Sequence, residues 1–184
     1  RRYTVACMRI INSKPVHLMT GPARNPEDDT AMVEDFMSDP NAATIVCGGT
    51  SATIVSRVLN RKLDVSLDYV DPEIPPIAYM EGVDLVTEGV LTLNRVVQLL
   101  RRYAKNETVS ETFFEELDKN NGASMVAKIL IEDCTEVHLY VGKAINSAYQ
   151  NPGLPFDLGI RQNLVKQLKE AVEGMGKKVT VTYY

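Results

Sequence analysis

The sequence is poor in the residues that build disulfide frameworks and metal sites. Its 184 residues include three cysteines and two histidines. Cys7, Cys47 and Cys134 are odd in number and far apart, so neither a disulfide framework nor a cysteine-rich metal site is expected. His17 and His138 each fall in an expected strand, and two histidines alone do not make a metal site. We therefore expect three buried thiols in apolar surroundings, two histidines at core or edge positions, and a cytoplasmic protein.

Charge and hydropathy exclude further classes of protein. The formal net charge of −4 and the pI near 5.3 argue against a general nucleic-acid binder and against attraction to anionic membranes. No apolar run approaches the roughly 20 residues that a membrane helix needs, and residues 1–11 lead to no signal-peptide cleavage site. The hydrophobic content of 45% is enough for a substantial core. Because the first residue is not methionine, we expect a piece of a longer protein or a processed product.

Strand-like and helix-like segments alternate along the chain. Strands are expected at residues 3–10, 16–20, 44–47, 63–67, 84–86, 136–141 and 179–184. Helices are expected from Asn25 to Asp39 and at residues 51–59, 92–103, 113–117, 122–133 and 158–176. The proline-rich residues 68–82 are expected to form an ordered loop or an edge segment. This alternation predicts an α/β fold with an open, mostly parallel sheet, helices on both faces, and Rossmann-like layering.

Three of the expected strands end in glycine-bearing loops: HLMTGP, IVCGGTS and HLYVGKAIN. If the strands are parallel, these loops meet at the carboxyl edge of the sheet, where α/β proteins bind ligands. Gly48 and Gly49 would let an anion approach the backbone, and Thr50 and Ser51 would add hydroxyls at a helix N-terminus. The candidate ligand-binding residues on these loops are Gly21, Gly48, Gly49, Thr50, Ser51, Gly142 and Asn146. The lysine of a Walker loop is absent, and an ordinary strand-to-helix turn with an N-cap fits the same residues equally well.

The stretch EGVDLVTEGV repeats an acidic residue followed by glycine. It adds Glu81, Asp84 and Glu88 as candidates for binding a ribose hydroxyl or a cation, although solvated loop carboxylates are the favoured interpretation. No Ser–His–Asp order, HExxH motif or Cys–His pair is present, so no catalytic residue is assigned.

Three long segments carry a resemblance to a known family: VCGGTSATIVSRVL, DYVDPEIPPIAYMEGVDLVTEGVLTL and HLYVGKAINSAYQNPGLPFDLGIRQNLVKQL. Together they resemble the C-terminal half of bacterial serine/threonine phosphatases of the stage II sporulation protein E family. Members carry an N-terminal metal-dependent phosphatase domain of the 2C type. The resemblance implies that residues 1–11, with the strand-like YTVACMRI, are a remnant of that domain's last strand, and that residues 12–184 form the C-terminal α/β domain. Arg1 and Arg2 stand where the metal-binding aspartates are expected, which implies no phosphatase activity in this chain alone.

The resemblance also implies a role. It makes the chain a non-catalytic regulatory or ligand-sensing domain, with Mn or Mg in the parent phosphatase domain and no cofactor of its own. The expected partners are the upstream phosphatase domain and a small phosphorylated or nucleotide ligand, with a homodimer left open and no nucleic acid or membrane. The residues also leave open a free-standing α/β enzyme that acts on a phosphorylated metabolite. An intact phosphatase domain upstream would favour the first function, and turnover by the isolated chain would favour the second.

Overall fold

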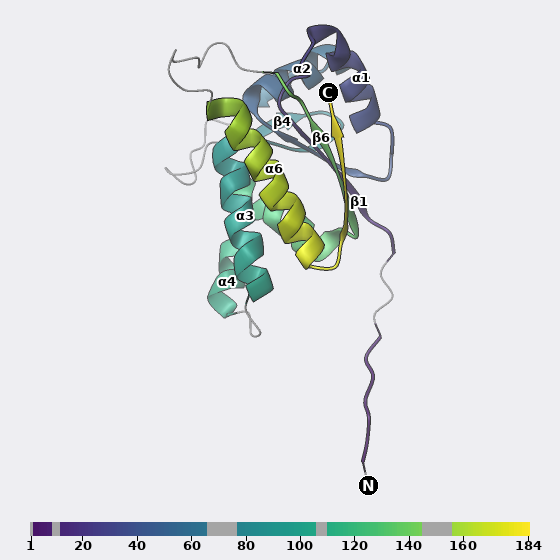
Figure 1. Cartoon of the computed structure of the whole chain (residues 1–184), viewed down its shortest axis with the longest axis vertical. Helices are drawn as coiled ribbons and strands as arrows, with labels where there is room; N and C mark the ends of the chain where they lie inside the picture. Colours follow the sequence, from purple (N-terminus) through teal and green to yellow (C-terminus); the bar gives the residue numbers. More distant parts are fainter. Residues whose placement is uncertain (1, 9–11, 66–76, 106–109, 145–155) are drawn as a thin grey trace.

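A twisted sheet forms the centre of the computed structural model, which describes residues 2–8, 12–65, 77–105, 110–144 and 156–184 (Figure 1). Within these residues the sheet has seven strands in the order β3-β4-β5-β2-β1-β6-β7. The strands are β1 (Pro15–Thr20), β2 (Ala43–Cys47), β3 (Leu63–Val65), β4 (Ala78–Met80), β5 (Val83–Thr87), β6 (Glu136–Val141) and β7 (Lys178–Tyr183). All pairs among β5, β2, β1, β6 and β7 are parallel, whereas β3 and β4 add an antiparallel edge. The parallel strands follow the order of doubly wound folds, with the topological switch point between β1 and β6.

Helices cover both faces of this sheet (Figure 1). The helices are α1 (Asp29–Phe36), α2 (Gly49–Leu59), α3 (Val90–Lys105), α4 (Glu111–Leu117), α5 (Gly122–Lys128) and α6 (Phe156–Gly174). Alternate residues of each strand face opposite layers, so Leu18 and Ile45 pack with α3, α5 and α6, while Met19 and Val46 pack with α1 and α2. Burial on both faces explains why the central strands are almost continuously apolar. The structure confirms the expected α/β class with its open, mostly parallel sheet.

Most expected elements are present, with differences at their ends. The strand at residues 136–141 matches β6, while the helix expected at 122–133 is α5 followed by a π-helical turn, Ile129–Asp133. The proline-rich segment contributes β4, which pairs antiparallel with β5. The expectation of a strand at residues 3–10 is wrong for the described part, because residues 2–8 form no strand and expose Tyr3, Val5 and Met8. Strand propensity alone does not form a strand when no neighbouring strand supplies backbone partners.

The cysteines differ from the expectation at one position. All three are free thiols, and Cys47 and Cys134 are buried, but Cys7 is exposed because its segment does not join the sheet. Burial raises the pKa of the Cys47 thiol to about 12, against a smaller opposing effect of the hydrogen bond from Thr87. Cys47 is therefore a core thiol rather than a reactive thiolate at neutral pH.

The two histidines lie in strands, as expected, and are register partners in β1 and β6. His17 is buried, with Nδ1 2.7 Å from the carbonyl oxygen of Phe36 at the end of α1. His138 Nε2 lies 2.8 Å from Thr182 Oγ1 in β7, and its ring stacks on Tyr140. Burial, followed by the neighbouring His17, lowers the pKa of His138. The pair connects α1 and β7 to the centre of the sheet.

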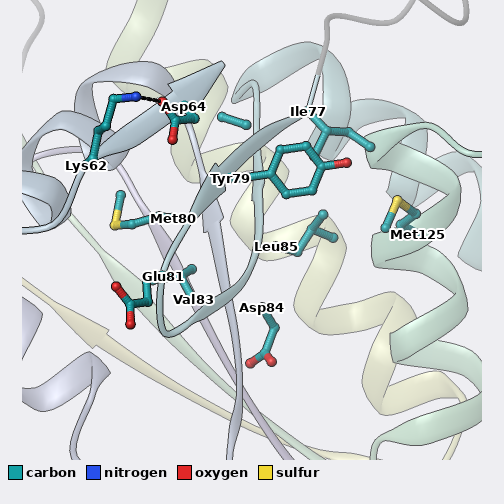
Figure 2. Close-up of a pocket in the computed structure, with 11 residues that line it drawn as sticks. Lys62, Asp64, Ile77, Tyr79, Met80, Glu81, Val83, Asp84, Leu85 and Met125 are labelled. Carbon is teal, nitrogen blue, oxygen red and sulfur yellow. Dashed lines mark ion pairs between the residues drawn. The ribbon is translucent and has the colours of Figure 1, made fainter. Parts of the chain in front are cut away.

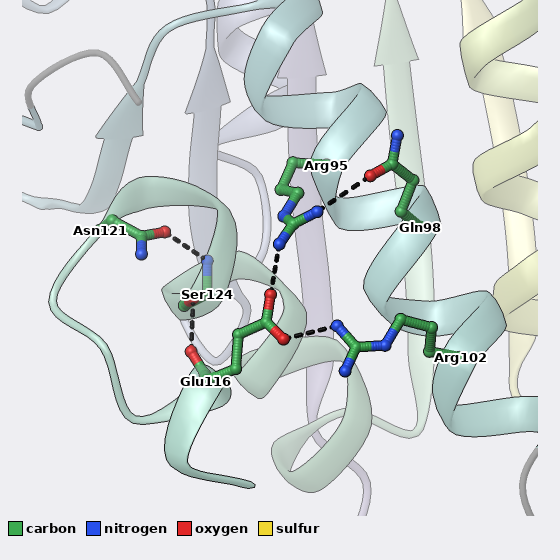
Figure 3. A network of polar contacts seen from close by, with 6 residues as sticks. All are labelled: Arg95, Gln98, Arg102, Glu116, Asn121 and Ser124. Atoms are coloured by element: carbon green, nitrogen blue, oxygen red, sulfur yellow. Dashed lines mark hydrogen bonds and ion pairs between the residues drawn. The ribbon is translucent and has the colours of Figure 1, made fainter. Parts of the chain in front are cut away.

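A polar network attaches α4 to its neighbours (Figure 3). The Glu116 carboxylate accepts hydrogen bonds from Arg95 and Arg102 of α3. The backbone carbonyl oxygen of Glu116 accepts one from the Ser124 hydroxyl of α5. Asn121 caps α5 by accepting the Ser124 N–H at 2.9 Å. Burial by itself raises the pKa of the Glu116 carboxyl, but the hydrogen bonds and charges of Arg102 and Arg95 together hold it below its usual range.

This network predicts an acid-sensitive contribution to stability. Glu116→Gln is expected to lower the free energy of unfolding by about 1 kcal/mol at neutral pH. Because the pKa is depressed in the folded state, the stabilisation is present above the unfolded value of about 4.3 and is lost as pH falls through the folded value. Urea unfolding over a pH series should therefore show the two curves converging in acid. Glu115→Gln, at an exposed position on the same helix, is the matched control, and an equal loss in that variant would contradict the prediction.

Candidate functional site

The carboxyl ends of β1, β2, β5 and β6 lie at one edge of the sheet, and most predicted site residues are there. Gly21, Gly48, Glu88 and Gly142 follow β1, β2, β5 and β6, and Gly49, Thr50 and Ser51 form the first turn of α2. The expected convergence of the three glycine-bearing loops follows from the parallel register of β2, β1 and β6. Glu81 and Asp84 lie at the opposite edge, and Asn146 lies outside the described residues.

At the switch point, the loops after β1 and β6 pack directly on each other. The Ala144 N–H donates to the carbonyl oxygen of Pro22 at 3.1 Å, and a Cβ on Gly142 would lie 1.9 Å from the same oxygen. Gly21 adopts a left-handed φ of 77°. Arg161 of α6 is buried here and donates through Nη1 to the carbonyl oxygens of Gly142 and Ala144. The left-handed φ at Gly21 and the close packing at Gly142 are enough to require glycine, and a ligand-binding role for both stays a prediction.

Helix α2 begins directly after β2 with no side-chain cap. Its N-cap is Gly48, whose φ of 126° favours glycine, and the Gly48 carbonyl oxygen accepts the first helical bond from Ala52 N–H. The N–H groups of Gly49, Thr50 and Ser51 precede that bond, so they have no acceptor within the helix. The structure thus corrects the expectation of a helix that starts near Ser51 with a Thr or Ser cap: Gly48 takes the cap position because only its backbone tolerates that conformation.

Two buried hydroxyls beside this edge lack a hydrogen-bond partner among the described residues. They are Ser51 Oγ in the first turn of α2 and Thr92 Oγ1 in the first turn of α3, and each residue is 1% exposed. The Ser51 oxygen lies 3.4 Å from the position that a Cβ on Gly48 would take. Leaving such a group unpaired costs about 1–3 kcal/mol. A partner that supplies an acceptor for Ser51 would recover part of this free energy.

The adjacent helix α3 differs from α2 because a carboxylate of the chain itself lies at its N-terminus. The Glu88 carboxylate accepts a hydrogen bond from Leu91 N–H at 3.1 Å, in the first turn of α3. Gly89 packs against the α2 turn, since a Cβ there would lie 3.3 Å from Gly48 Cα. Glu88 therefore caps α3, while the first turn of α2 has no equivalent carboxylate.

Glu81 and Asp84 belong to a separate region of the molecule (Figure 2). They line a pocket of about 380 Å³ beside the antiparallel edge, together with the apolar side chains of Ile77, Leu85 and Met125. Asp84 Oδ2 accepts hydrogen bonds from Thr44 N–H at 2.7 Å and from Thr44 Oγ1 at 2.9 Å, which ties β2 to β5. The structure does not bring these two carboxylates to the glycine loops.

Sequence reasoning missed Gly89 and Thr92. The signal was present in EGVLT, where glycine follows a strand and a hydroxyl residue stands three positions later. Gly48 and Ser51 have the same spacing in GGTS, and in both helices the hydroxyl is buried without a partner among the described residues. The two adjacent strands β2 and β5 thus lead into helices that share the spacing of a glycine and a buried hydroxyl, while only α3 has a carboxylate cap.

Comparison with models of protein families, with curated proteins and with solved structures found no match. Among the described residues, no helix has the length and apolar character needed to cross a membrane. Within the same part of the chain, no three His, Cys, Asp or Glu side chains are grouped so as to hold a metal ion. Function must therefore be inferred from the geometry of the chain itself.

Proposed function

We propose that the first turn of α2 binds the phosphate group of a small phosphorylated molecule or nucleotide. The observation that carries this proposal is a helix N-terminus with no side-chain cap, together with the buried Ser51 hydroxyl of its first turn, which has no partner among the described residues. Phosphate oxygens are acceptors only, so they would satisfy both the N–H groups of the first turn and the Ser51 hydroxyl.

The electrostatics favour α2 over α3 as the position of the anion. The dipole of a helix stabilises an anion at its N-terminus by roughly 0.3–1 kcal/mol. At α3 the Glu88 carboxylate already takes this position, and its charge opposes a second anion there. At α2, Gly49 and Thr50 are exposed, and no side chain in the described part of the chain caps the turn. Binding would come from backbone and hydroxyl donors without a lysine, which suits a ligand that is released readily.

We propose further that the chain is a non-catalytic regulatory or ligand-sensing domain of a stage II sporulation protein E-like serine/threonine phosphatase. The resemblance of three long segments supports this role, as does a site made of backbone and hydroxyl donors rather than an acid–base pair. The proposed partner is the upstream phosphatase domain, which would hold Mn or Mg. The described residues offer no cluster of His, Cys, Asp or Glu side chains suited to a metal ion.

Two serines of α2, Ser51 and Ser56, provide the test of the phosphate site. Ser51→Ala removes the unpaired hydroxyl, so it is expected to leave stability unchanged or raise it by up to about 1 kcal/mol, while weakening phosphate binding about tenfold. Ser56→Ala is the matched control: its hydroxyl donates to the Arg61 carbonyl oxygen, so its loss should lower stability and leave binding intact. Thermal unfolding and calorimetry with inorganic phosphate and AMP measure both effects.

Normal binding in Ser51→Ala together with weakened binding in Ser56→Ala would exclude the proposed site. If Ser51→Ala bound both probes as the unmodified chain does, the orphan hydroxyl would have no part in binding. Native mass spectrometry of protein taken from cells would show a retained ligand directly. Steady turnover of a phosphorylated metabolite by the purified chain would replace the regulatory role with the enzymatic alternative.

A further inference from the structure

A groove between α6 and β7, on a different part of the molecule from the α2 turn, gathers positive charge on a chain whose net charge is −4. Its volume is about 630 Å³. The lining includes Lys143 after β6, Lys166, Lys169 and Val165 on α6, and Val181 and Tyr183 on β7. None of the described residues in this lining is acidic. The groove therefore has a positive rim and a partly apolar floor.

Each of the three lysines at the groove has a weak internal partner among the described residues. Lys166 and Lys169 form solvent-exposed i,i+4 ion pairs with Glu170 and Glu173, at N–O distances of 3.9 and 3.8 Å. Lys143 Nζ lies 4.7 Å from the centre of the Tyr183 ring. Exposed ion pairs of this kind contribute little free energy, so the carboxylates of a binding partner can replace those of Glu170 and Glu173.

The backbone of β7 adds a second element to this surface. In the sheet order β7 is the last strand, and within the described residues it pairs only with β6. The outer side of such an edge strand presents N–H and C=O groups to which a further strand can bind. Val181 is partly exposed and Tyr183 is exposed; they lie two residues apart on the same face of β7 and offer contacts for alternate apolar side chains.

We propose that this groove binds an extended acidic segment of a partner protein, which adds a strand beside β7. Its carboxylates would face the three lysines, and its intervening apolar side chains would pack on Val181 and Tyr183. The charges come from two separate elements and border an apolar floor, which fits an alternating peptide better than a compact anion. Residues 2–8 of a second copy are a poor match, because they contain Arg2 and no acidic residue.

The test uses the full 184-residue chain and a fluorescein-labelled peptide of alternating glutamate and valine. At low salt, Lys166→Gln with Lys169→Gln is expected to weaken binding about tenfold, measured by fluorescence anisotropy. The control, Lys105→Gln with Lys119→Gln, makes the same charge change at exposed positions elsewhere and should change binding by less than about twofold. Hydrogen exchange should show new protection in β7 when the peptide is bound.

Three results would overturn the proposal. An equal loss in the control pair would mean that only net charge matters. Binding without new protection in β7 would exclude strand addition. If a peptide with serine in place of valine bound as tightly, or tripolyphosphate competed at the same concentration as the peptide, the groove would be a site for small polyanions instead.

Discussion

Gly142→Ala is expected to lower the free energy of unfolding by about 3 kcal/mol. A Cβ at this position would lie 1.9 Å from the Pro22 carbonyl oxygen and 2.5 Å from the Gly21 carbonyl oxygen. Both are backbone atoms in the loop after β1, so no side-chain rotation relieves the overlap. The loops after β1 and β6 would have to separate, which would break the Ala144 to Pro22 hydrogen bond and displace the carbonyl that Arg161 contacts.

Gly174→Ala is the control for this substitution. It makes the same chemical change at an exposed helical glycine where a Cβ would meet nothing within 4 Å. We expect it to leave stability unchanged or to raise it by about 0.5–1 kcal/mol, because alanine favours helix more than glycine does. Urea unfolding followed by circular dichroism compares the two. If Gly142→Ala were as stable as the control, the two loops would not pack closely in solution.

The sequence predicts the sheet well because apolar runs and turn residues are local signals. The strand at residues 136–141 is β6 as expected, and the glycines after β1, β2 and β6 lie at one edge because those strands are parallel. The strand expected at residues 3–10 shows the limit of local signals. Its β-favouring residues have no neighbouring strand in the described structure, so residues 2–8 remain outside the sheet and Cys7 is exposed.

The roles of the individual glycines could not be predicted, because they depend on contacts between distant segments. Gly48 is needed for its left-handed φ, and Gly142 for close approach to the loop after β1. A Cβ on Gly49 would meet nothing within 4 Å, although the sequence places Gly48 and Gly49 side by side as one motif. The buried, unpaired state of Ser51 is equally a product of packing. The folded structure is therefore needed to distinguish Gly48, whose φ shapes the turn, from Gly49, which leaves the first turn of α2 uncrowded.

This difference makes Gly49 the decisive position for the proposed phosphate site. Gly49→Val is expected to abolish binding of inorganic phosphate and AMP while changing stability by less than about 1 kcal/mol. The position is exposed and uncrowded, so the fold should accept the side chain. In a helix the Cα–Cβ bond is tilted toward the N-terminus. A valine in the first turn would therefore extend over the N–H groups that the phosphate needs.

Gly174→Val provides the matched change at an exposed glycine of α6, far along the chain from the α2 turn, and should bind both probes normally. Calorimetry measures the binding, and thermal unfolding confirms that each variant is folded. Gly49→Val blocks the backbone donors, whereas Ser51→Ala removes the hydroxyl donor beneath them, so loss of binding in both would locate the anion at the first turn of α2. Normal binding by a folded Gly49→Val variant would leave the double glycine as a structural turn between β2 and α2, with no part in ligand recognition.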